Sequence, residues 1–517
     1  MMPAKRNLTL VSLQTLLDGL LELESDVFVT GLKIDARTIQ DGDVFIAVAG
    51  SKEHGLMYAD QAVKAGAIAI IYDPSSGGEL LARQVKKQSG ICLLELADLG
   101  RHLSAIASRF YQHPSDQLSV IGITGTNGKT SVSHFIAQAL NTYEKSCGLI
   151  GTLGWGQLNE LKRTMNTTPD AISVQNQLAV LRDEGCNEVA MEVSSHGLDQ
   201  GRVKDVHFKG AVFTNLSHDH LDYHRTIEAY GEAKLALFKC PSLKFVVLNR
   251  DDPFSATIEK ALAPSVAVYS FSRDAENQGI ENSFYISNEQ LVSTGLSFDV
   301  SFNKQIVSIH STLFGAFNVD NIVASLAVLV AIGDEFSVAA KKVGAIQGVS
   351  GRMQHIAVAG VKPTVIVDYA HTPDALKLAL MSLREHGQGA LRLVFGCGGN
   401  RDQAKRPLMG AIAAEWADQI VITNDNPRFE SARHIAEQIK AGANAANEVE
   451  VVLDRAQAIK DTIMRAAEDD IVLIAGKGHE EYQQIGSEKI AFSDIAQVKS
   501  ALKAKRMLEK GGDACKT

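Results

Sequence analysis

The sequence has little of the positive charge that a nucleic-acid partner requires. Its 51 Lys and Arg residues are outnumbered by 60 Asp and Glu residues, which gives a formal net charge of -9. Nucleic-acid binding normally relies on a basic face or stripe that neutralises phosphates, so the composition argues against such a partner. Any phosphate that the protein binds is therefore expected at a local site.

Cysteines are few and scattered. None of them forms a Cys-X-X-Cys pair, and they stand at Cys92, Cys147, Cys186, Cys240, Cys397 and Cys515. This spacing favours free thiols in a reducing compartment over disulfides or a zinc site. We therefore expect a cytoplasmic protein.

Long hydrophobic runs are missing as well. Near the N-terminus Lys5 and Arg6 are followed by Gln14 and Asp18, which interrupt the apolar core that a signal peptide needs. The longest uncharged apolar stretch, residues 322–333, is too short to span a bilayer core of roughly 30 Å as a helix. We predict a buried helix there and no membrane insertion.

The length and composition are those of a globular protein with several domains. At roughly 100 to 200 residues per domain, 517 residues suggest about three domains. A helical pattern stops at a proline and polar cluster at 112–116, and a glycine and serine cluster at 347–352 precedes another strand-like run. The predicted domains are therefore 1–113, 114–348 and 349–517.

The third domain alternates strand-like runs with amphipathic segments of helix length. The runs are 365–368, 391–395, 419–423, 449–453 and 471–475. Repeated units of this kind predict a parallel, doubly wound, Rossmann-like sheet, in which ligands bind beyond the carboxyl ends of the strands. The segments that follow these ends are rich in glycine or polar residues, and they are Asp368, 396–399, 424–428 and 476–480.

A glycine-rich loop begins the second domain. A strand-like run at 118–124 leads into it, and the residues after it have helical apolar spacing. Such a loop presents backbone N–H groups to phosphates, while its lysine reaches the β- and γ-phosphates and its threonine ligates Mg²⁺. Ile123 stands where the strict P-loop pattern has glycine, and a plain turn with a capping threonine is the alternative. The predicted ATP-binding loop comprises Gly125, Thr126, Asn127, Gly128, Lys129, Thr130 and Ser131.

Two later strand-like runs end on residues that suit a metal site. Glu192 ends one run, and His220 follows another. Taken singly, Glu192 is more simply an edge-strand residue that faces water, and His220 is more simply an ordinary surface or core histidine. A carboxylate and a phosphate oxyanion about 4 Å apart repel each other by on the order of 4 kcal/mol at an effective dielectric near 20. A carboxylate beside the phosphate loop therefore requires a cation such as Mg²⁺ between the two negative charges. Oxygen-preferring Mg²⁺ makes His220 the weaker candidate.

These segments together resemble the Mur ligase family. The shared motifs are GTNGKTS at 125–131, MEVSSHGL at 191–198, TNLSHDHLDYH at 214–224 and YGEAKLALF at 230–238, with further similarity at 42–50, 367–376 and 475–483. The resemblance implies an α/β fold with a smaller N-terminal UDP-substrate domain, a central P-loop-type ATP-binding domain and a C-terminal Rossmann-like amino-acid-binding domain. It also implies an ATP- and Mg²⁺-dependent ligase that adds the third amino acid to UDP-N-acetylmuramoyl-L-alanyl-D-glutamate through an acyl phosphate, in peptidoglycan synthesis.

The resemblance also assigns roles to particular residues. Lys129, Glu192, His220 and a carbamylated Lys234 are the expected catalytic residues, and Thr130, Glu192, His220 and Lys234 are the expected metal site. Without the resemblance, Lys234 reads as an exposed helical lysine. Further ATP contacts are expected at Asn318, Arg352, Asp368 and His371. The UDP-muramoyl peptide is expected to contact Ile34, Ala36, Ser51, Asn166, Thr167, Thr168, Ser194, Gln200 and Arg202.

One of these positions departs from the family's pattern. The family commonly has Asp-Ser-Arg where this chain has Asp35-Ala36-Arg37. The missing hydroxyl removes one expected contact to the UDP-sugar.

The segment 425–428 resembles the family signature for meso-diaminopimelate as the added amino acid. Diaminopimelate differs from lysine by a distal carboxylate, which calls for a planar cationic fork beside an acceptor for the ammonium group. A site with such a cation is expected to reject lysine by roughly 10⁴-fold. Outside the family context this segment reads as a turn. The expected contacts are Arg401, Asp425, Asn426, Pro427, Arg428, Gly476 and Glu480.

Several rival functions are compatible with the loop alone. They are a lysine-adding homologue, the family member that adds D-alanyl-D-alanine, a folylpolyglutamate synthetase and a non-catalytic nucleotide-binding scaffold. The segment 425–428 and the long N-terminal domain disfavour the other ligases, and the set Lys129, Glu192, His220 and Lys234 disfavours the scaffold. We expect a monomer whose partners are small-molecule substrates.

Overall fold

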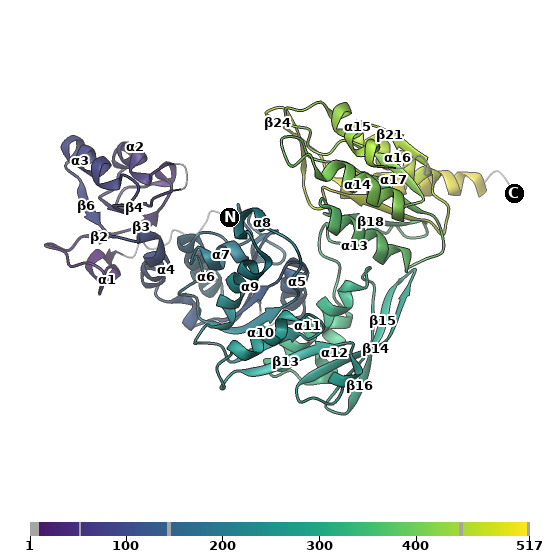
Figure 1. Ribbon diagram of the computed structural model, residues 1–517, viewed down its shortest axis with the longest axis horizontal. Helices are drawn as coiled ribbons and strands as arrows, with labels where there is room; N and C mark the ends of the chain where they lie inside the picture. Colours follow the sequence, from purple (N-terminus) through teal and green to yellow (C-terminus); the bar gives the residue numbers. More distant parts are fainter. Residues whose placement is uncertain (1–9, 51–52, 142–145, 444–447, 514–517) are drawn as a thin grey trace. The chain divides into compact units, whose positions relative to one another are not determined.

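The computed structural model describes residues 10–50, 53–141, 146–443 and 448–513. It divides into two compact units, Met1–Tyr269 and Ser270–Thr517. Figure 1 labels their helices and strands. This division falls inside the predicted central domain, and the two predicted domain boundaries, at 113/114 and 348/349, stay a prediction. Among the described residues, no helix combines the length and the apolar character needed to cross a bilayer.

The first unit begins with a small parallel sheet in the order β3-β4-β5-β6. Alternate residues of β4 and β5 enter two apolar clusters, one shared with α1 and α4 and the other with α2 and α3. This alternation gives the α/β layering predicted for the N-terminal domain. The elements are β3 Gly31–Lys33, β4 Asp43–Ala47, β5 Ala69–Tyr72, β6 Cys92–Glu95, α1 Leu13–Leu16, α2 Ala59–Lys64, α3 Gly78–Ser89 and α4 Leu99–Phe110.

A larger sheet of the first unit carries the predicted phosphate loop. Six strands of this ten-stranded sheet belong wholly to the first unit. They lie in the order β12-β11-β7-β10-β8-β9, and all of them but the edge strand β9 run parallel. The ends of β10 and β11 flank β7, since Glu192 and Val212 both pair with Ile123. The elements are β7 Ser119–Thr124, β8 Cys147–Gly151, β9 Gly154–Gln157, β10 Glu188–Glu192, β11 Phe208–Phe213, β12 Phe245–Asn249 and, after the loop, α5 Lys129–Leu140.

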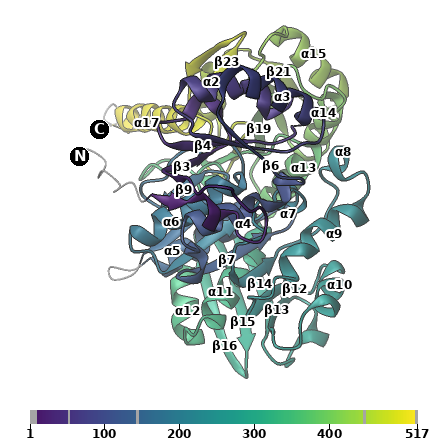
Figure 2. The same cartoon turned by 90° about the vertical axis from the view of Figure 1, so that its left-hand side faces the viewer.

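The second unit begins with the antiparallel strands β14, β15 and β16, which α11 and α12 cover (Figure 2). The apolar stretch 322–333 lies largely in α11, whose side chains are mostly buried. The predicted buried helix is therefore confirmed. The elements are β14 Ser283–Val292, β15 Gly295–Phe302, β16 Gln305–Ser311, α11 Phe317–Ala331 and α12 Phe336–Gly344.

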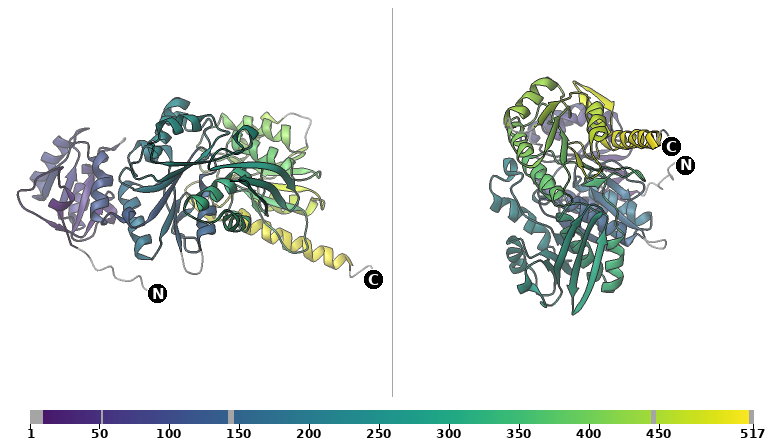
Figure 3. Two further views of the ribbon diagram at one scale, coloured as in Figure 1. Left: turned by 90° about the horizontal axis from the view of Figure 1, so that it is seen from below. Right: turned by 90° about the vertical axis from the view of Figure 1, so that its right-hand side faces the viewer.

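The second unit ends in a sheet of the order β17-β18-β22-β19-β20-β21, parallel except for β17. Apolar clusters fill both of its faces, one with α13, α14 and α15 and the other with α16 and α17. Figure 3 shows the ribbon from two further sides. The strand order reverses at β22, which lies between β18 and β19, so the ligand crevice of such a sheet is expected there. The predicted Rossmann-like sheet and its five strands are confirmed. The elements are β17 Gln354–His355, β18 Thr364–Asp368, β19 Leu391–Phe395, β20 Gln419–Ile422, β21 Glu448–Val451, β22 Ile471–Ala475, α13 Pro373–Arg384, α14 Lys405–Trp416, α15 Ala432–Gly442, α16 Arg455–Arg465 and α17 Asp494–Asp513.

Candidate active site

The glycine-rich loop joins β7 to α5, as predicted. Gly125 has a φ of 147°, and a Cβ there would lie 1.9 Å from the hydroxyl oxygen of Thr214. Glycine is therefore required by both conformation and space. The backbone N–H of Thr126 donates to the Asn215 carbonyl at 2.8 Å, and that of Asn127 donates to the Asn215 side-chain oxygen at 3.0 Å. The residues after β11 thus brace the loop.

Two ammonium groups converge on this loop. The Lys129 Nζ donates to the carbonyls of Gly125 and Thr126, both at 2.8 Å, and the Lys234 Nζ donates to the Gly125 carbonyl at 2.9 Å. Lys234 is 1% exposed, so its reading as a surface lysine is wrong. Burial lowers the pKa of the Lys234 ammonium well below its ordinary value, and the Lys129 charge lowers that pKa further.

Glu192 meets the first turn of α5. Its fully buried carboxylate accepts hydrogen bonds from the hydroxyls of Thr130 and Thr152, both at 2.9 Å, and from the Thr152 N–H at 2.9 Å. Hard oxygen donors of this kind fit Mg²⁺. Within the described ranges, no three His, Cys, Asp or Glu side chains converge to hold a metal. Mg²⁺ would therefore depend on nucleotide phosphate oxygens and water for the rest of its ligands.

His220 lies in an aromatic and imidazole cluster beside Lys234. Its ring centroid is 4.9 Å from that of His196 and 6.0 Å from that of Tyr230, whose ring lies 4.1 Å from the Lys234 Nζ. Burial, followed by the charge of His220, lowers the pKa of His196. Within the described part of the chain, His220 makes no hydrogen bond to the glycine-rich loop.

Four of the nine residues predicted to hold the muramoyl peptide form one hydrogen-bonded group near Glu192. The Thr168 hydroxyl donates to the Glu192 carbonyl at 2.9 Å and accepts from the Ser194 N–H, while its own carbonyl accepts from Arg202 at 2.7 Å. Arg202 in turn donates from Nε to the Gln200 side chain at 3.0 Å. Thr168 is fully buried, so in this structure it positions its neighbours. Its contact with the muramoyl peptide stays a prediction.

The remaining predicted contacts are placed separately. The Thr167 hydroxyl lies 3.1 Å from that of Thr152, and Asn166 is exposed. In the N-terminal domain Ile34 is 39% exposed, whereas Ala36 is buried. Ser51 lies outside the described residues.

The second unit holds the other residues predicted to bind ATP. The Asp368 carboxylate, at the end of β18, accepts from the N–H groups of Met353 and Ala370, both at 2.7 Å, and burial raises its pKa. The guanidinium of Arg352 lies 4.7 Å from the Tyr369 ring, whose centroid is 4.6 Å from that of His371. These side chains form one cluster at the carboxyl end of β18.

Asn318 stands apart from this cluster. It is 3% exposed, and its amide bonds to the Phe314 carbonyl at 2.6 Å and to Asn321 at 2.9 Å. In this structure the Asn318 side chain forms hydrogen bonds at the first turn of α11.

The residues predicted to bind diaminopimelate do come together, beyond the ends of β19, β20 and β22. A Cβ on Gly398 would lie 2.9 Å from the Arg428 Nη1 and 3.8 Å from the Arg401 Cγ, so both arginines border this glycine. The Asn426 amide donates to the Glu480 carboxylate at 2.9 Å. A Cβ on Gly476 would lie 2.8 Å from the Asp425 carboxylate, and burial raises the pKa of that carboxyl. The sheet end where a ligand crevice is expected therefore carries separate cationic and anionic groups.

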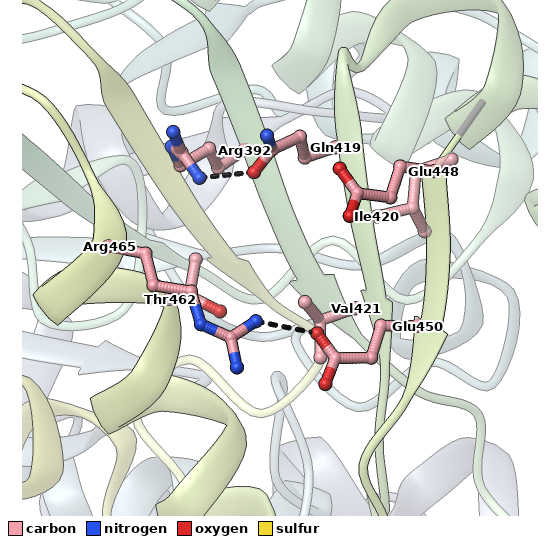
Figure 4. A pocket seen from close by; sticks show the side chains of 8 residues that line it. All are labelled: Arg392, Gln419, Ile420, Val421, Glu448, Glu450, Thr462 and Arg465. Atoms are coloured by element: carbon pink, nitrogen blue, oxygen red, sulfur yellow. Dashed lines mark hydrogen bonds and ion pairs between the residues drawn. The ribbon is translucent and has the colours of Figure 1, made fainter.

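A pocket near the opposite, amino end of this sheet lies between β19, β20, β21 and α16 (Figure 4). Its two arginines are already engaged, because Arg392 bonds Asp470 and Gln419 and Arg465 bonds Glu450 at 2.9 Å. Ligand sites of doubly wound sheets lie at the carboxyl ends of the strands. We therefore read this pocket as part of the sheet's packing.

Three side chains in these sites were missed by sequence reasoning. Thr152 bonds Glu192, Tyr230 covers the Lys234 ammonium, and Lys477 bonds Glu480 at 2.8 Å. Thr152 directly follows a strand and could have been found from the rule that parallel strand ends share one edge. Tyr230 and Lys477 lie inside family motifs but have no local signal of their own.

A glycine-rich loop between a strand and a helix, an acidic residue beside that loop and a doubly wound parallel sheet are typical of nucleotide-binding α/β enzymes. Three family models match in succession: "Mur ligase family, catalytic domain" at 28–111, "Mur ligase middle domain" at 123–329 and "Mur ligase, glutamate ligase domain" at 351–478. The chain belongs to the Mur ligase family and is an enzyme of the ligase class.

Similar proteins cover almost the whole chain. A protein of Alkalilimnicola ehrlichii is 44% identical over 95% of this chain and 99% of its own length, and one of Coxiella burnetii is 43% identical over 93% and 97%. Both are named UDP-N-acetylmuramoyl-L-alanyl-D-glutamate–2,6-diaminopimelate ligase. A solved structure with that name is 33% identical, with a TM-score of 0.69 over 96% of this chain and 100% of its own.

Proposed function

We propose that this protein adds meso-2,6-diaminopimelate to UDP-N-acetylmuramoyl-L-alanyl-D-glutamate with hydrolysis of ATP. The products are the UDP-muramoyl tripeptide, ADP and phosphate, and the reaction belongs to peptidoglycan precursor synthesis. The observation that carries the proposal is the 44% identity, over 95% of the chain, to a protein named for this reaction. The glycine-rich loop and the charged crevice that contains Arg428 and Glu480 support it.

ATP is the proposed phosphoryl donor. Lys129, at the start of α5, is within reach of the loop carbonyls that frame a phosphate site, and Thr130 contacts Glu192 at 2.9 Å. Mg²⁺, when bound there, would neutralise the repulsion between the Glu192 carboxylate and the phosphate oxygens. A carbamylated Lys234 would add a carboxylate-like group beside the same loop.

The reaction requires two bond-forming steps. The glutamyl carboxylate attacks the γ-phosphorus of ATP, which releases ADP and leaves an acyl phosphate. The amine of diaminopimelate then attacks the acyl carbon, loses a proton, and the tetrahedral intermediate expels phosphate as the amide forms. Lys129 stabilises the negative charge on the transferring phosphoryl group, and the loop N–H groups hold it in place.

Selection of the amino acid is assigned to the crevice of the C-terminal sheet. Arg428 and Arg401 provide cations for the distal carboxylate, and Glu480 provides an acceptor for the distal ammonium group. L-Lysine lacks the distal carboxylate and would leave the arginines without their partner. We therefore propose that diaminopimelate is used in preference to lysine.

We also propose the three-domain division at 113/114 and 348/349. It is supported by the three family matches, which occupy 28–111, 123–329 and 351–478. A cytoplasmic location and a monomeric state stay predictions.

The proposal is tested by measuring ADP release and tripeptide formation with purified protein. We expect both to require UDP-muramoyl dipeptide and meso-diaminopimelate together, with little product from L-lysine. Lys129→Ala should lower kcat by roughly 10²- to 10³-fold, because one stabilising group for transferring charge is lost. Lys260→Ala, an exposed lysine of the helix Phe254–Ala261, is the matched control and should be unchanged. Equal product with L-lysine would contradict the specificity, and normal turnover by Lys129→Ala would contradict the mechanism.

A further inference from the structure

Lys477 is a buried cation in the crevice where the strand order of the C-terminal sheet reverses. It follows β22 and is 0% exposed. Its Nζ donates to the Glu480 Oε2 at 2.8 Å and to the Asn426 Oδ1 at 3.2 Å. A buried ammonium is tolerated only when it is paired and hydrogen-bonded, so the three side chains constrain one another.

The contacts of Glu480 are uneven between its two oxygens. Oε2 accepts from both Lys477 and the Asn426 amide, at 2.8 and 2.9 Å. Oε1 accepts no hydrogen bond from any residue in the described ranges, and the side chain is 20% exposed. The carboxylate is therefore held through one oxygen and presents the other.

Asn426 completes this arrangement. Its Oδ1 accepts from Lys477 and also from the Gln484 N–H at 2.8 Å, while its Nδ2 donates to Glu480. Because Oδ1 receives two donors, the amide cannot flip without losing both bonds. The orientation of Glu480 is thereby tied to the backbone of β23, Tyr482–Ile485.

The cationic side of the crevice is tied to the same strand. The Arg428 N–H donates to the Gln484 carbonyl at 3.1 Å, and its Nη1 donates to the Gly399 carbonyl at 2.8 Å. The guanidinium of Arg428 and the carboxylate of Glu480 therefore stand on a common frame. A site that fixes a cation and an anion at two defined positions can distinguish the two configurations of a carbon that carries both an ammonium group and a carboxylate.

We propose that Lys477 is a positioning residue that orients Glu480, and that it thereby makes the crevice select the configuration at the distal carbon of 2,6-diaminopimelate. The inference rests on the proposed function. A protein must contact at least three substituents of a stereocentre to distinguish its two configurations. Here these are the carbon chain, the carboxylate and the ammonium group. If Glu480 turned freely, the ammonium attachment would no longer have a defined place.

The test compares meso- and LL-diaminopimelate as substrates of the full-length protein and of Lys477→Met. We expect the variant to raise KM for the meso isomer by about 10- to 100-fold and to reduce the meso-to-LL ratio of kcat/KM at least about tenfold. KM for ATP and for the UDP-muramoyl dipeptide should stay within about threefold of wild type, because the substitution removes no contact with either of these substrates. Lys489→Met is the matched control, because the Nζ atoms of Lys489 and Lys477 both lie near the Tyr482 ring, at 4.3 and 5.6 Å from its centroid. The control variant should leave the meso-to-LL ratio of kcat/KM unchanged.

A second measurement separates positioning from general damage. If Lys477 acts through Glu480, its effect on the isomer ratio should largely vanish in a Glu480→Gln background, as a double-mutant cycle shows. Lys477→Gln, which keeps a donor without the charge, serves if the methionine variant fails to fold, and it should lower the isomer ratio less. An unchanged isomer ratio, or additive effects in the cycle, would overturn the proposal. A wild-type protein that uses neither isomer would instead contradict the proposed function.

Discussion

At the residue scale, the least expected feature is the environment of Lys234. Its ammonium lies 4.1 Å from the Tyr230 ring and shares the Gly125 carbonyl with Lys129. Burial and the neighbouring Lys129 charge lower the pKa of Lys234, so its neutral amine is more accessible than that of an ordinary lysine. A neutral amine can add CO₂, and the resulting carbamate would replace repulsion between two ammonium groups with attraction.

Lys234→Ala should therefore lose activity, by roughly 10²-fold or more, as expected when a group that stabilises charge in the transition state is removed. Short carboxylates such as acetate should restore part of that activity by occupying the space of the carbamate. The measurement is kcat with and without added carboxylate. Unchanged activity in Lys234→Ala would remove this residue from the site.

The pH dependence of carbamylation follows from the direction of the Lys234 pKa. Because the pKa is lowered, the reactive neutral amine is lost as pH falls through the lowered value and gained as pH rises through it. Incorporation of labelled bicarbonate into wild-type protein should therefore increase with pH and be absent from Lys234→Ala. Incorporation that increased toward acid would contradict the assignment.

At the scale of elements, one buried ion pair joins two helices to two strands. Arg455 begins α16 and bonds the carboxylate of Asp494, the first residue of α17, at 2.7 Å, with both side chains 0% exposed. Its guanidinium also donates to the carbonyls of Asn424, after β20, and Ala475, at the end of β22, at 3.1 and 2.9 Å. The pair thus holds the strand ends from which Asp425 and Gly476 continue.

Removing Arg455 should be costly because Asp494 would remain as an unpaired buried charge. We expect Arg455→Ala to lower the free energy of unfolding by about 3–5 kcal/mol. Arg465→Ala, at the other end of α16, breaks an exposed ion pair with Glu450 and should cost at most about 1 kcal/mol. Urea unfolding of both variants measures the difference. Similar losses for the two would contradict this account of the pair.

At the scale of the whole molecule, packed α/β layers hold the fold, and no disulfide joins the cysteines that the structure describes. The five cysteines in the described ranges are free, and Cys147, Cys186 and Cys397 among them are buried. Cys515 lies outside those ranges. Burial raises the pKa of Cys397 to about 11, so that its reactive thiolate is scarce at neutral pH. Cys92 is exposed.

Thiol titration without reductant should therefore show fast reaction of Cys92 in the folded protein and slow reaction of Cys147, Cys186 and Cys397. In denaturant all six thiols of the chain should react. Reductant should leave the free energy of unfolding unchanged. Fewer than six reactive thiols in denaturant would indicate a disulfide.

The sequence by itself determined the α/β class, the strands of the C-terminal sheet and the loop at 125–131, because strand and helix periodicity and glycine-rich turns are local properties of the chain. It also determined the family, through motifs that are read residue by residue. It could not reveal the burial of Lys234, the contact of Thr152 with Glu192 or the bonds of Lys477 to Asn426 and Glu480. Thr152 and Glu192 are 40 residues apart, Lys477 and Asn426 are 51 residues apart, and Lys234 and its partner Gly125 are 109 residues apart. Only the tertiary structure decided them, since the order of strands in a sheet sets which loops meet at its carboxyl edge.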